Sequence, residues 1–379
     1  MQTVGILGGG QLARMLALAG APLGLQFLVV DSVADACAGQ VAPLVQANWR
    51  DFDALDDFAR RVDVATFDFE NVPAETARWL AERTPVFPNP RALAISQDRL
   101  AEKNLFGDIG LATPPFATVD SRDDLARAVE RIGCPSILKT RRLGYDGKGQ
   151  FRLKSTADIE AAWHALAGAP SILEAFVPFE FELSVIAVRS REGEFRTYPL
   201  TRNWHTDGIL SASLAPAPGC QLLAPVAFAH ARRIAEELDY VGTFALELFV
   251  CDGQLLGNEM APRVHNSGHW TIEGAPASQF ENHLRAVLGL PLGDTTALGI
   301  NAMLNWVGEL PPATPVLAES RAHWHDYGKA PRVGRKVGHA TVCAATPQEM
   351  RERLARLGTA LGRETQVAPV IDALADSRR

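Results

Sequence analysis

The sequence predicts a mixed fold class, in which an α/β region with a parallel sheet precedes α+β regions that become mainly antiparallel. Three observations predict it. Strand and helix patterns alternate over the first hundred residues, a compact unit of strands and helices lies at about 113–180, and strand patterns dominate after Phe181. The 379 residues are too many for one simple domain and fit two or three.

Composition and charge indicate an ordinary globular protein. Apolar residues make up 47% and charged residues 21%, which excludes a disordered or fibrous chain. The net charge of −7 excludes a polyanion-binding protein, although a local basic patch stays open. We expect no membrane span and no signal peptide, because the apolar runs are short and the N-terminus lacks a basic start. The five cysteines form no C-x-x-C pair, so we expect reduced thiols in a cytoplasmic protein.

The first region alternates strands and helices. Thr3–Leu7 is a short apolar run that predicts a strand, and Gln11–Ala19 has apolar residues at helical spacing. Phe27–Asp31 and Val62–Phe69 are predicted to be buried strands, with an amphipathic helix at Asp51–Arg61 between them. This rhythm is typical of a parallel sheet with helices on its faces.

Prolines separate this region from the next. A helix is predicted over Ser96–Ile109 with Ser96 as its N-cap, and the Thr113-Pro114-Pro115 step marks a boundary because two prolines stiffen the chain. Farther along, the patterns predict strands at Ser136–Thr140, Phe151–Leu153, Ile172–Val177, Phe181–Val188 and Arg196–Leu200, helices at Thr156–Ala167, Ala227–Leu238 and Pro347–Leu357, and a hairpin at Thr243–Met260.

A glycine motif joins the first strand to the first helix. Gly8 and Gly10 are followed by Ala13, and Asp31 lies about 20 residues farther on, as in a dinucleotide-binding fingerprint. The N-terminus of the helix could also hold an anion of another ligand. A dinucleotide site, another anion site and tight packing alone all stay open, because the pattern requires only a close approach of the backbone.

A glycine-rich loop occupies residues 141–150 and follows a strand that ends near Lys139. Its glycines let backbone N–H groups approach an oxyanion, and Lys139 and Lys148 add positive charge, which together suit a triphosphate. The loop lacks the Walker A pattern, and a strand rather than a helix follows it. A plain glycine-bearing hairpin turn is the alternative.

The predicted hairpin carries the strongest chemical indication. A two-residue loop at Asp252-Gly253 would place Glu247 opposite Asn258. A three-residue loop with a left-handed glycine, which we expect, would place Glu247 opposite Glu259. Two carboxylates about 5 Å apart on an apolar sheet destabilise each other, and a divalent cation such as Mg²⁺ removes the repulsion. The alternative is that both glutamates reach solvent at a sheet edge.

Further polar segments follow the hairpin. One site is expected just after it, where hydrogen-bonding side chains gather within an apolar neighbourhood at Arg263, His265, Asn266, Ser267 and His269; a polar loop over a core Trp is the alternative. A basic run suits phosphate recognition or a solvated surface and consists of Lys329, Arg332, Arg335 and Lys336. We interpret His323-Trp324-His325 as packing, because no cysteine or carboxylate pair is near in sequence.

These motifs together resemble those of a known family. The chain carries, in order, GGGQLARM, QDRLAEKNLF, GYDGKGQ, GNEMAPRVHNSGHW and GRKVGH. Over nearly its whole length it resembles the N5-carboxyaminoimidazole ribonucleotide synthetases, ATP-dependent carboxylases of purine biosynthesis with the ATP-grasp fold. The resemblance implies a Rossmann-like domain at 1–97, an ATP-grasp region at 98–290 with a lid at about 113–180, a C-terminal domain at 291–379, and a homodimer.

The resemblance also implies where ATP and Mg²⁺ bind. Lys139 would contact the α-phosphate, the glycine-rich loop would close over the triphosphate, and Glu247 and Glu259 would hold the metal ion. Backbone groups of 174–177, on a strand edge, would face adenine. The implied nucleotide-binding residues are Arg99, Lys139, Gly144, Tyr145, Asp146, Gly147, Lys148, Gly149, Gln150, Glu174, Ala175, Phe176, Val177, Glu182, His205, Asn258 and Glu259. Leu143 departs from the family pattern, which leads us to expect glycine or another small residue there.

The same resemblance implies a pocket for the acceptor, 5-aminoimidazole ribonucleotide. Its residues would be Gln11, Glu70, Tyr145, Asp146, Arg263, His265, Asn266, Ser267, Lys329, Arg335 and Lys336. The phosphate of the acceptor would lie against Lys329, Arg335 and Lys336. The glycine segment Gly8–Gln11 would then belong to this cleft and not to a nicotinamide site.

The implied reaction begins when bicarbonate attacks the γ-phosphate of ATP, which gives carboxyphosphate and ADP. The catalytic residues Arg263, His265 and Lys336 would stabilise this intermediate while the amine of the acceptor captures CO₂, and the proton would pass to His265 or to the released phosphate. Three alternatives stay open: an NAD-dependent oxidoreductase, an ATP-grasp ligase with another acceptor (a formate-using transformylase or a biotin carboxylase), and a non-catalytic binding protein.

Overall fold

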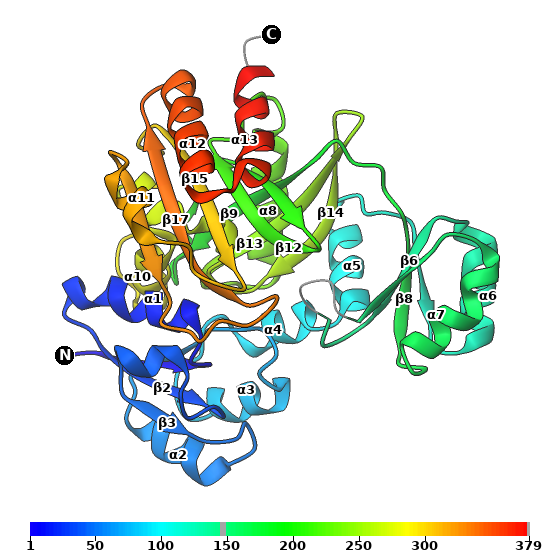
Figure 1. Ribbon diagram of the computed structural model, residues 1–379. Helices are drawn as coiled ribbons and strands as arrows, with labels where there is room; N and C mark the ends of the chain where they lie inside the picture. The colour runs from blue at the N-terminus through cyan, green and yellow to red at the C-terminus, as the bar shows by residue number, and fades with distance from the viewer. Residues whose placement is uncertain (145–148, 377–379) are drawn as a thin grey trace.

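The computed structural model describes residues 1–144 and 149–376, which form three β-sheets (Figure 1). A parallel sheet comes first, an antiparallel sheet forms a small unit to one side, and a large antiparallel sheet makes up the rest. The mixed fold class predicted from the sequence is confirmed. Within the described residues, no helix has the length and apolarity that crossing a bilayer requires.

The N-terminal sheet has four parallel strands in the order β3-β2-β1-β4. The predicted strands are present as β1 (Thr3–Leu7), β2 (Gln26–Asp31) and the shorter β4 (Val64–Phe67). The sequence did not predict β3 (Leu44–Gln46), because three residues give no periodicity. Helices α1 (Gln11–Gly20), α2 (Phe52–Arg60) and α3 (Ala74–Ala81) accompany this sheet, with the short 3₁₀ helices η1 (Ala21–Leu23) and η2 (Cys37–Gln40).

Two helices, α4 (Pro90–Ser96) and α5 (Arg99–Asp108), lead out of the first region. The predicted single helix with Ser96 as N-cap is wrong, because Ser96 ends α4 and Asp98 caps α5 through the N–H groups of the next turn. The carboxylate of Asp98 also accepts a hydrogen bond from Nη2 of Arg141 at 2.9 Å, which ties the start of α5 to the glycine-rich loop.

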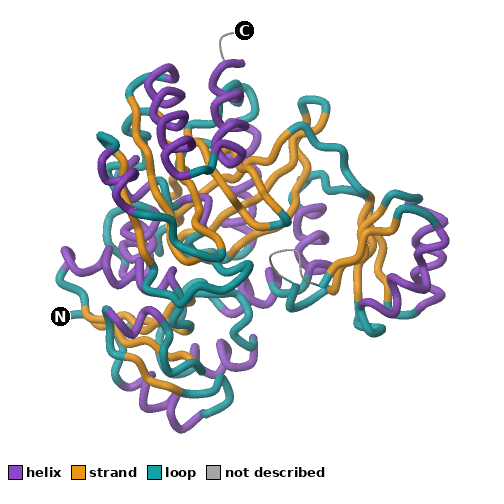
Figure 2. Tube along the Cα trace, viewed as in Figure 1, coloured by secondary structure: helices purple, strands orange, loops and turns teal. Residues whose placement is uncertain are grey.

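The small unit contains an antiparallel sheet in the order β5-β8-β6-β7, with two helices on the side away from the large sheet (Figure 2). Its apolar core joins Leu125 and Val129 of one helix to Leu138 and Leu173 of the sheet. The elements are β5 (Phe116–Val119), α6 (Arg122–Ile132), β6 (Ser136–Thr140), β7 (Gln150–Leu153), η3 (Thr156–Asp158), α7 (Ile159–Ala165) and β8 (Ser171–Ala175).

The large antiparallel sheet runs in the order β14-β13-β9-β11-β12-β15-β17-β16, and β10 pairs with β9. The predicted strand at Arg196–Leu200 is wrong beyond Thr197, and the strands β11 and β12 were not predicted. The strands are β9 (Phe181–Arg189), β10 (Phe195–Thr197), β11 (Thr201–Thr206), β12 (Ile209–Ala215), β13 (Gly242–Cys251), β14 (Gln254–Ala261), β15 (Ile300–Val307), β16 (Ala322–Asp326) and β17 (Lys336–Ala344).

Helices cover this sheet and join it to the first region. Apolar side chains of α10 pack with those of α1, as Leu284 and Leu16 belong to one buried cluster. The C-terminal helices α12 and α13 pack on the far end of the sheet, where Leu354 and Val370 are fully buried. The helices are α8 (Ala224–Glu237), η4 (Asn266–Gly268), α9 (Thr271–Gly274), α10 (Gln279–Leu288), α11 (Ala313–Ala318), α12 (Pro347–Leu361) and α13 (Glu364–Asp376).

Candidate active site

The hairpin of β13 and β14 places two glutamates side by side. Its turn is the two-residue Asp252-Gly253 turn, in which both φ angles are positive, 49° and 70°. A β-bulge then shifts the register, so that Glu247 pairs with Glu259 and Asn258 is the extra residue. The expected pairing is confirmed, but the expected three-residue loop is wrong, because the bulge and not the turn supplies the shift.

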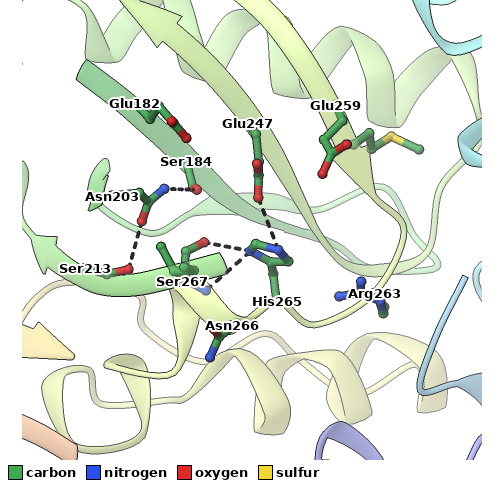
Figure 3. Close-up of polar contacts among 12 residues, drawn as sticks. Glu182, Ser184, Asn203, Ser213, Glu247, Glu259, Arg263, His265, Asn266 and Ser267 are labelled. Atoms are coloured by element: carbon green, nitrogen blue, oxygen red, sulfur yellow. Dashed lines mark hydrogen bonds and ion pairs between the residues drawn. The ribbon is translucent and has the colours of Figure 1, made fainter. Parts of the chain in front are cut away.

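Because Glu247 is buried, it is unfavourable for this pair to carry two negative charges. Glu247 is 9% exposed, and its pKa is raised to about 8, first by burial and then by the charge of Glu259. Glu259 accepts a hydrogen bond from Nη1 of Arg99 at 3.1 Å. Figure 3 shows both carboxylates on the side of the hairpin that faces His265 and Arg263. The alternative of two solvated acids fails for Glu247, because β13 is an interior strand.

The bulge is held by Lys103, a buried residue of α5 that our sequence analysis did not single out. Lys103 is 1% exposed, and its Nζ donates to the carbonyl oxygens of Gly257 at 3.1 Å and Asn258 at 2.9 Å. It also lies 3.8 Å from Oε2 of Glu174. One buried cation therefore connects the bulge to the small antiparallel unit.

Glu102 of α5 holds the same strand one residue beyond the pair. Its Oε1 accepts the main-chain N–H of Met260 at 2.6 Å, and burial, followed by the charge of Glu259, raises its pKa to about 8. Arg99, Glu102 and Lys103 stand three and four positions apart and thus share one face of a helix. That spacing was visible in the sequence and could have placed all three on one helix face, but it did not show that this face contacts the hairpin.

On the facing unit, Lys139 of β6 and Glu174 of β8 form a buried ion pair, with Nζ and Oε2 2.9 Å apart. Burial alone would raise the pKa of Glu174, but the charges of Lys139 and Lys103 lower it to about 2. Glu174 is therefore an anion at neutral pH. Lys139 lies on β6, the strand that precedes the glycine-rich loop.

The expectation that residues 174–177 lie on a strand edge is wrong for the first two of them. Glu174 and Ala175 belong to β8, which lies between β5 and β6. The N–H of Ala175 donates to Pro115 and that of Phe176 to Pro135. Backbone contacts to a nucleotide base, as predicted from the family, would have to come from the residues after the strand, such as Val177.

Four predicted residues of the glycine-rich loop, Tyr145, Asp146, Gly147 and Lys148, lie outside the described residues. Gly144 directly precedes them, Gly149 follows with a φ of 69°, and Gln150 begins β7 opposite Lys139. Leu143 has a φ of 63° and is 73% exposed. The left-handed region favours glycine, which is the small residue expected there. The loop also connects two paired strands, as the hairpin alternative requires, so its role toward a triphosphate stays a prediction.

Glu182 of β9 and His205 of β11 form a second pair, with Oε2 and Nδ1 2.9 Å apart. Burial would lower the pKa of His205, but the hydrogen bond and charge of Glu182 raise it overall. Beside them, Nδ2 of Asn203 donates to Ser184 at 2.6 Å, and Oγ of Ser213 donates to Asn203 at 2.8 Å (Figure 3). The sequence analysis missed this series of hydrogen-bonded side chains, since Asn203, its middle member, lies on a strand that was not predicted.

His265 lies at the centre of the polar cluster in Figure 3. Its Nε2 is 3.2 Å from Oε1 of Glu247, and its Nδ1 accepts the N–H of Ser267 at 3.3 Å and lies 2.8 Å from Oγ of that serine. Burial, followed by the charges of Arg263 and Lys336, lowers the pKa of His265 well below its usual value. The ring is therefore neutral, with its proton on Nε2, toward Glu247.

The side chain of Asn266, a predicted pocket residue, forms its hydrogen bonds within the core. Its Nδ2 donates to Oδ1 of Asn305 at 3.0 Å, and Nδ2 of Asn305 donates back to Asn266 at 2.5 Å and to Leu210 at 2.8 Å. Asn266 is 6% exposed. The pair fixes the segment that carries His265, and a direct contact between Asn266 and an acceptor stays a prediction.

Arg263 and Glu70 join the large sheet to the N-terminal sheet. Nε of Arg263 donates to Oε2 of Glu70 at 2.5 Å, and Nε2 of Gln97 donates to the carbonyl oxygens of Glu70 and Val72. Burial would raise the pKa of Glu70, but the charge and hydrogen bond of Arg263 lower it. Glu70 follows the carboxyl end of β4, where ligands bind in parallel sheets.

The glycine motif is held by hydrogen bonds to Asp31, the acidic residue of the predicted fingerprint. Oδ2 of Asp31 accepts the N–H of Gly9 at 2.6 Å, and Oδ1 accepts the N–H of Val33 at 2.8 Å. Gly8 has a φ of 101°, and a Cβ on Gly10 would lie 2.6 Å from the carboxylate of Asp68. Tight packing therefore accounts for the glycines, because a Cβ at Gly10 would collide with Asp68 and Asp31 holds the loop together.

The basic run approaches this glycine segment. Nζ of Lys329 donates to Oε1 of Gln11, the first residue of α1. Burial lowers the pKa of Lys329. Arg335 donates to the carbonyl oxygen of Ala330 at 3.3 Å, and Lys336 begins β17. Residues far apart in the sequence therefore meet where the acceptor pocket is expected.

Of the two histidines that the sequence analysis interpreted as packing, His325 is packed, whereas the interpretation is wrong for His323, which is exposed. Nε2 of His325 lies 2.7 Å from Oε1 of Glu273, and its ring stacks on His339 with centroids 4.2 Å apart. The hydroxyl of Tyr327 lies 2.8 Å from Nδ1 of His339. Across the part of the chain that the structure describes, no group of three or more His, Cys, Asp or Glu is arranged to hold a metal ion alone.

Comparison with known proteins gives three matching family models. The ATP-grasp domain matches residues 104–280, the ribonucleotide synthetase preATP-grasp domain matches residues 1–97, and the phosphoribosylaminoimidazole carboxylase C-terminal domain matches residues 301–353. Together they cover most of the chain: the preATP-grasp model spans the N-terminal sheet, the ATP-grasp model spans the small unit and the large sheet as far as β14, and the C-terminal model spans β15 to β17.

Relatives and solved structures agree with these models. The N5-carboxyaminoimidazole ribonucleotide synthase of Pseudomonas aeruginosa is 52% identical over 93% of this chain and 98% of its own. The crystal structure of the Thermus thermophilus synthetase has a TM-score of 0.91 at 54% identity, over 94% of this chain and 98% of its own. The Aspergillus clavatus synthase in complex with ADP and 5-aminoimidazole ribonucleotide has a TM-score of 0.85 at 31% identity, over 99% of both chains. The chain is therefore an ATP-grasp enzyme and belongs to the N5-carboxyaminoimidazole ribonucleotide synthase family.

Proposed function

We propose that this chain carboxylates 5-aminoimidazole ribonucleotide with bicarbonate and ATP, yielding N5-carboxyaminoimidazole ribonucleotide, ADP and phosphate in purine biosynthesis. The observation that carries the proposal is the facing pair of buried Glu247 and partly exposed Glu259, with His265 in contact with the first acid and Arg99 with the second. Family membership supports the acceptor and the phosphoryl donor. We further propose a homodimer and a cytoplasmic location.

ATP lies between the small antiparallel unit and the hairpin in this proposal. Lys139 faces the phosphates, Glu182 accepts from the ribose hydroxyls with His205 beside it, and the chain after β8 faces the base. The unit at about 113–180 acts as a lid. A short-lived intermediate requires such a cover, because water would otherwise consume it.

Mg²⁺ fits the two facing acids. A buried carboxyl whose pKa is raised by a second carboxylate is stabilised when a cation lies between them, and carboxylate oxygens are the ligands that magnesium prefers. The described residues offer two acids rather than a complete ligand set, so the remaining ligands are phosphate oxygens and water. Bound magnesium would neutralise charge on the transferring phosphoryl group.

The acceptor lies between the large sheet and the N-terminal sheet. Its phosphate meets Lys329, Arg335 and Lys336 beside Gln11, and its imidazole lies near Arg263 and His265. Arg263 is kept charged by Glu70, which suits the stabilisation of an anionic intermediate.

The reaction then needs three steps. Bicarbonate oxygen attacks the γ-phosphorus and ADP leaves, which forms carboxyphosphate. Carboxyphosphate releases CO₂ and phosphate beside Arg263 and Lys336. The exocyclic amine bonds to the carbon of CO₂, and its proton passes to His265 or to the released phosphate.

The test is ADP release measured with and without 5-aminoimidazole ribonucleotide, and with and without bicarbonate. Full turnover is expected only when both are present, with one N5-carboxyaminoimidazole ribonucleotide formed for each ADP. Turnover that requires formate in place of bicarbonate, or that does not depend on the acceptor, would refute the proposal.

A further inference from the structure

One buried amide side chain holds the main chain of His265 from both sides. Oε1 of Gln279 accepts the N–H of His265 at 2.9 Å, and Nε2 of Gln279 donates to the carbonyl oxygen of His265 at 2.6 Å. Gln279 is fully buried at the start of α10. A side-chain amide thus pairs with one residue's peptide groups as a neighbouring strand would, at a point where the chain has left the sheet.

Gln279 is itself fixed by its surroundings. Its N–H donates to Oγ1 of Thr271 at 2.9 Å, and its carbonyl oxygen accepts from Oγ1 of Thr243 at 3.1 Å. A Cβ on Gly268 would lie 2.6 Å from Oε1 of Gln279, so glycine there leaves the space that the amide fills. The clamp is therefore rigid, and rigidity is what a positioning group needs.

The position of the His265 ring depends on this clamp. The ring spans Glu247 on one side and Ser267 on the other, at 3.2 Å and 2.8 Å. Rotation of its main chain would break both contacts, because the ring is carried on a short side chain. Within the part of the chain that the structure describes, Gln279 forms no hydrogen bond with Glu247 or Ser267 and acts on them through His265.

We propose that Gln279 is a positioning residue that holds the imidazole of His265 against Glu247. The proposal rests on the proposed function of this site. It predicts that loss of the clamp slows turnover and lets carboxyphosphate decay before transfer, while the affinity for ATP is unchanged.

The same helix offers a matched control. Asn282 is also fully buried, and it clamps Gly293 in the same two-way manner, accepting the N–H at 2.7 Å and donating to the carbonyl oxygen at 3.3 Å. Gly293 lies outside the candidate site. Asn282→Leu therefore removes the same kind of two-way contact, together with a hydrogen bond to the hydroxyl of Tyr198 at 2.8 Å, without touching His265.

The experiment compares Gln279→Leu with Asn282→Leu, each in the wild-type and in a His265→Asn background. For Gln279→Leu we expect at least a tenfold lower kcat, more than one ADP released for each carboxylated product, and a KM for ATP within twofold of wild type. Asn282→Leu should keep the one-to-one ratio. In the His265→Asn background, Gln279→Leu should have less than a twofold further effect, because the two residues act as one unit. A full tenfold further effect would overturn the proposal.

Two additions keep the outcome decisive. If Gln279→Leu does not fold, Gln279→Glu replaces it, since the carboxyl retains the acceptor for the His265 N–H and should give an intermediate ratio of ADP to product. If the wild-type protein shows no bicarbonate-dependent turnover, the proposed function is refuted. The positioning role of Gln279 is then tested separately, by measuring the imidazole NMR signals of His265. Those signals should shift in Gln279→Glu and not in Asn282→Leu; unchanged signals would overturn the positioning role.

Discussion

Among single residues, Glu247 and Glu259 set the chemistry of the site, because burial and then the charge of Glu259 make Glu247 costly to ionise. We predict that Glu259→Gln lowers kcat for ADP release by about 100-fold or more, since removing a charged ligand loses several kcal/mol of electrostatic stabilisation. Turnover at increasing Mg²⁺ concentration measures it. Glu237→Gln, at an exposed pair with Arg91, is the control. Near-normal turnover of Glu259→Gln at limiting Mg²⁺ would contradict the metal assignment.

Glu102 predicts a pH dependence of stability. Its pKa rises from 4.5 to about 8 on folding, so the folded state favours the protonated form. The free energy of unfolding must then fall as the pH rises between these values. From pH 6.5 to 8.5 the loss from this group is about 2 kcal/mol. Glu102→Gln, which imitates the neutral acid, should flatten this slope in thermal or urea denaturation without ligands. An equally steep slope in the variant would show that Glu102 does not titrate there.

Elements position these residues, and the bulge in β14 is the feature on which the pair depends. In a hairpin with the same two-residue turn but no bulge, Asn258 would lie opposite Glu247, and Glu259 would not pair with Glu247. The sequence allowed the pair to be predicted, because Asp252-Gly253 fixes the hairpin and only two registers remained. It did not allow the bulge to be predicted, because the group that holds it, Lys103, comes from a helix more than 150 residues earlier.

We predict that Lys103→Met weakens both the fold and the site. It removes both hydrogen bonds to the bulge and leaves Glu174 with fewer positive neighbours, for which the expected loss is about 3 kcal/mol of stability. Urea denaturation measures this loss. Turnover should need more Mg²⁺ as well, because Glu247 and Glu259 lose their register. A variant with reduced stability but an unchanged Mg²⁺ requirement would separate Lys103 from the metal site.

Other elements show what local sequence could supply. Three of the four strands of the first sheet, β1, β2 and β4, and the helix α1 were predicted because their apolar pattern is clear. The N-cap prediction at Ser96 was wrong because a short helix capped by Asn89 already ends there, and Asp98 caps the next helix. The strands β11 and β12 mix polar and apolar residues, since their inner faces carry Asn203 and Ser213 rather than a plain core.

At the scale of the whole molecule, the site exists only where three sheets meet. Arg263 and Glu70 join the large and N-terminal sheets, whereas Lys103 and Glu174 join the hairpin to the small unit. No local pattern predicts such meetings. The motif resemblance assigned these regions to one site. It gave neither the contacts of Glu102 and Lys103 nor the clamp on His265, because those residues hold other residues of the site in place.

Ligand binding should therefore stabilise the whole chain. We predict that ATP at 100 times its dissociation constant, with Mg²⁺, raises the free energy of unfolding by about 2.7 kcal/mol. With EDTA the same ATP concentration should give less than half of this increase, because the facing acids then repel the phosphates. Differential scanning calorimetry, with a non-hydrolysable ATP analogue as the ligand, measures both. Equal stabilisation with and without Mg²⁺ would argue against a shared ion.

The closed loop around Asp31 has a consequence for how such chains are classified. Its spacing from the glycines satisfies a search for ribose-binding acids, yet each of its oxygens already accepts an amide N–H of its own chain. A carboxylate oxygen can accept a second hydrogen bond, so these contacts do not exclude a sugar, but they give the acid a structural role in holding the turn. The spacing of glycines and an acid therefore identifies a loop of this shape, and the contacts of the acid show that the shape itself is a reason for the acid to be there.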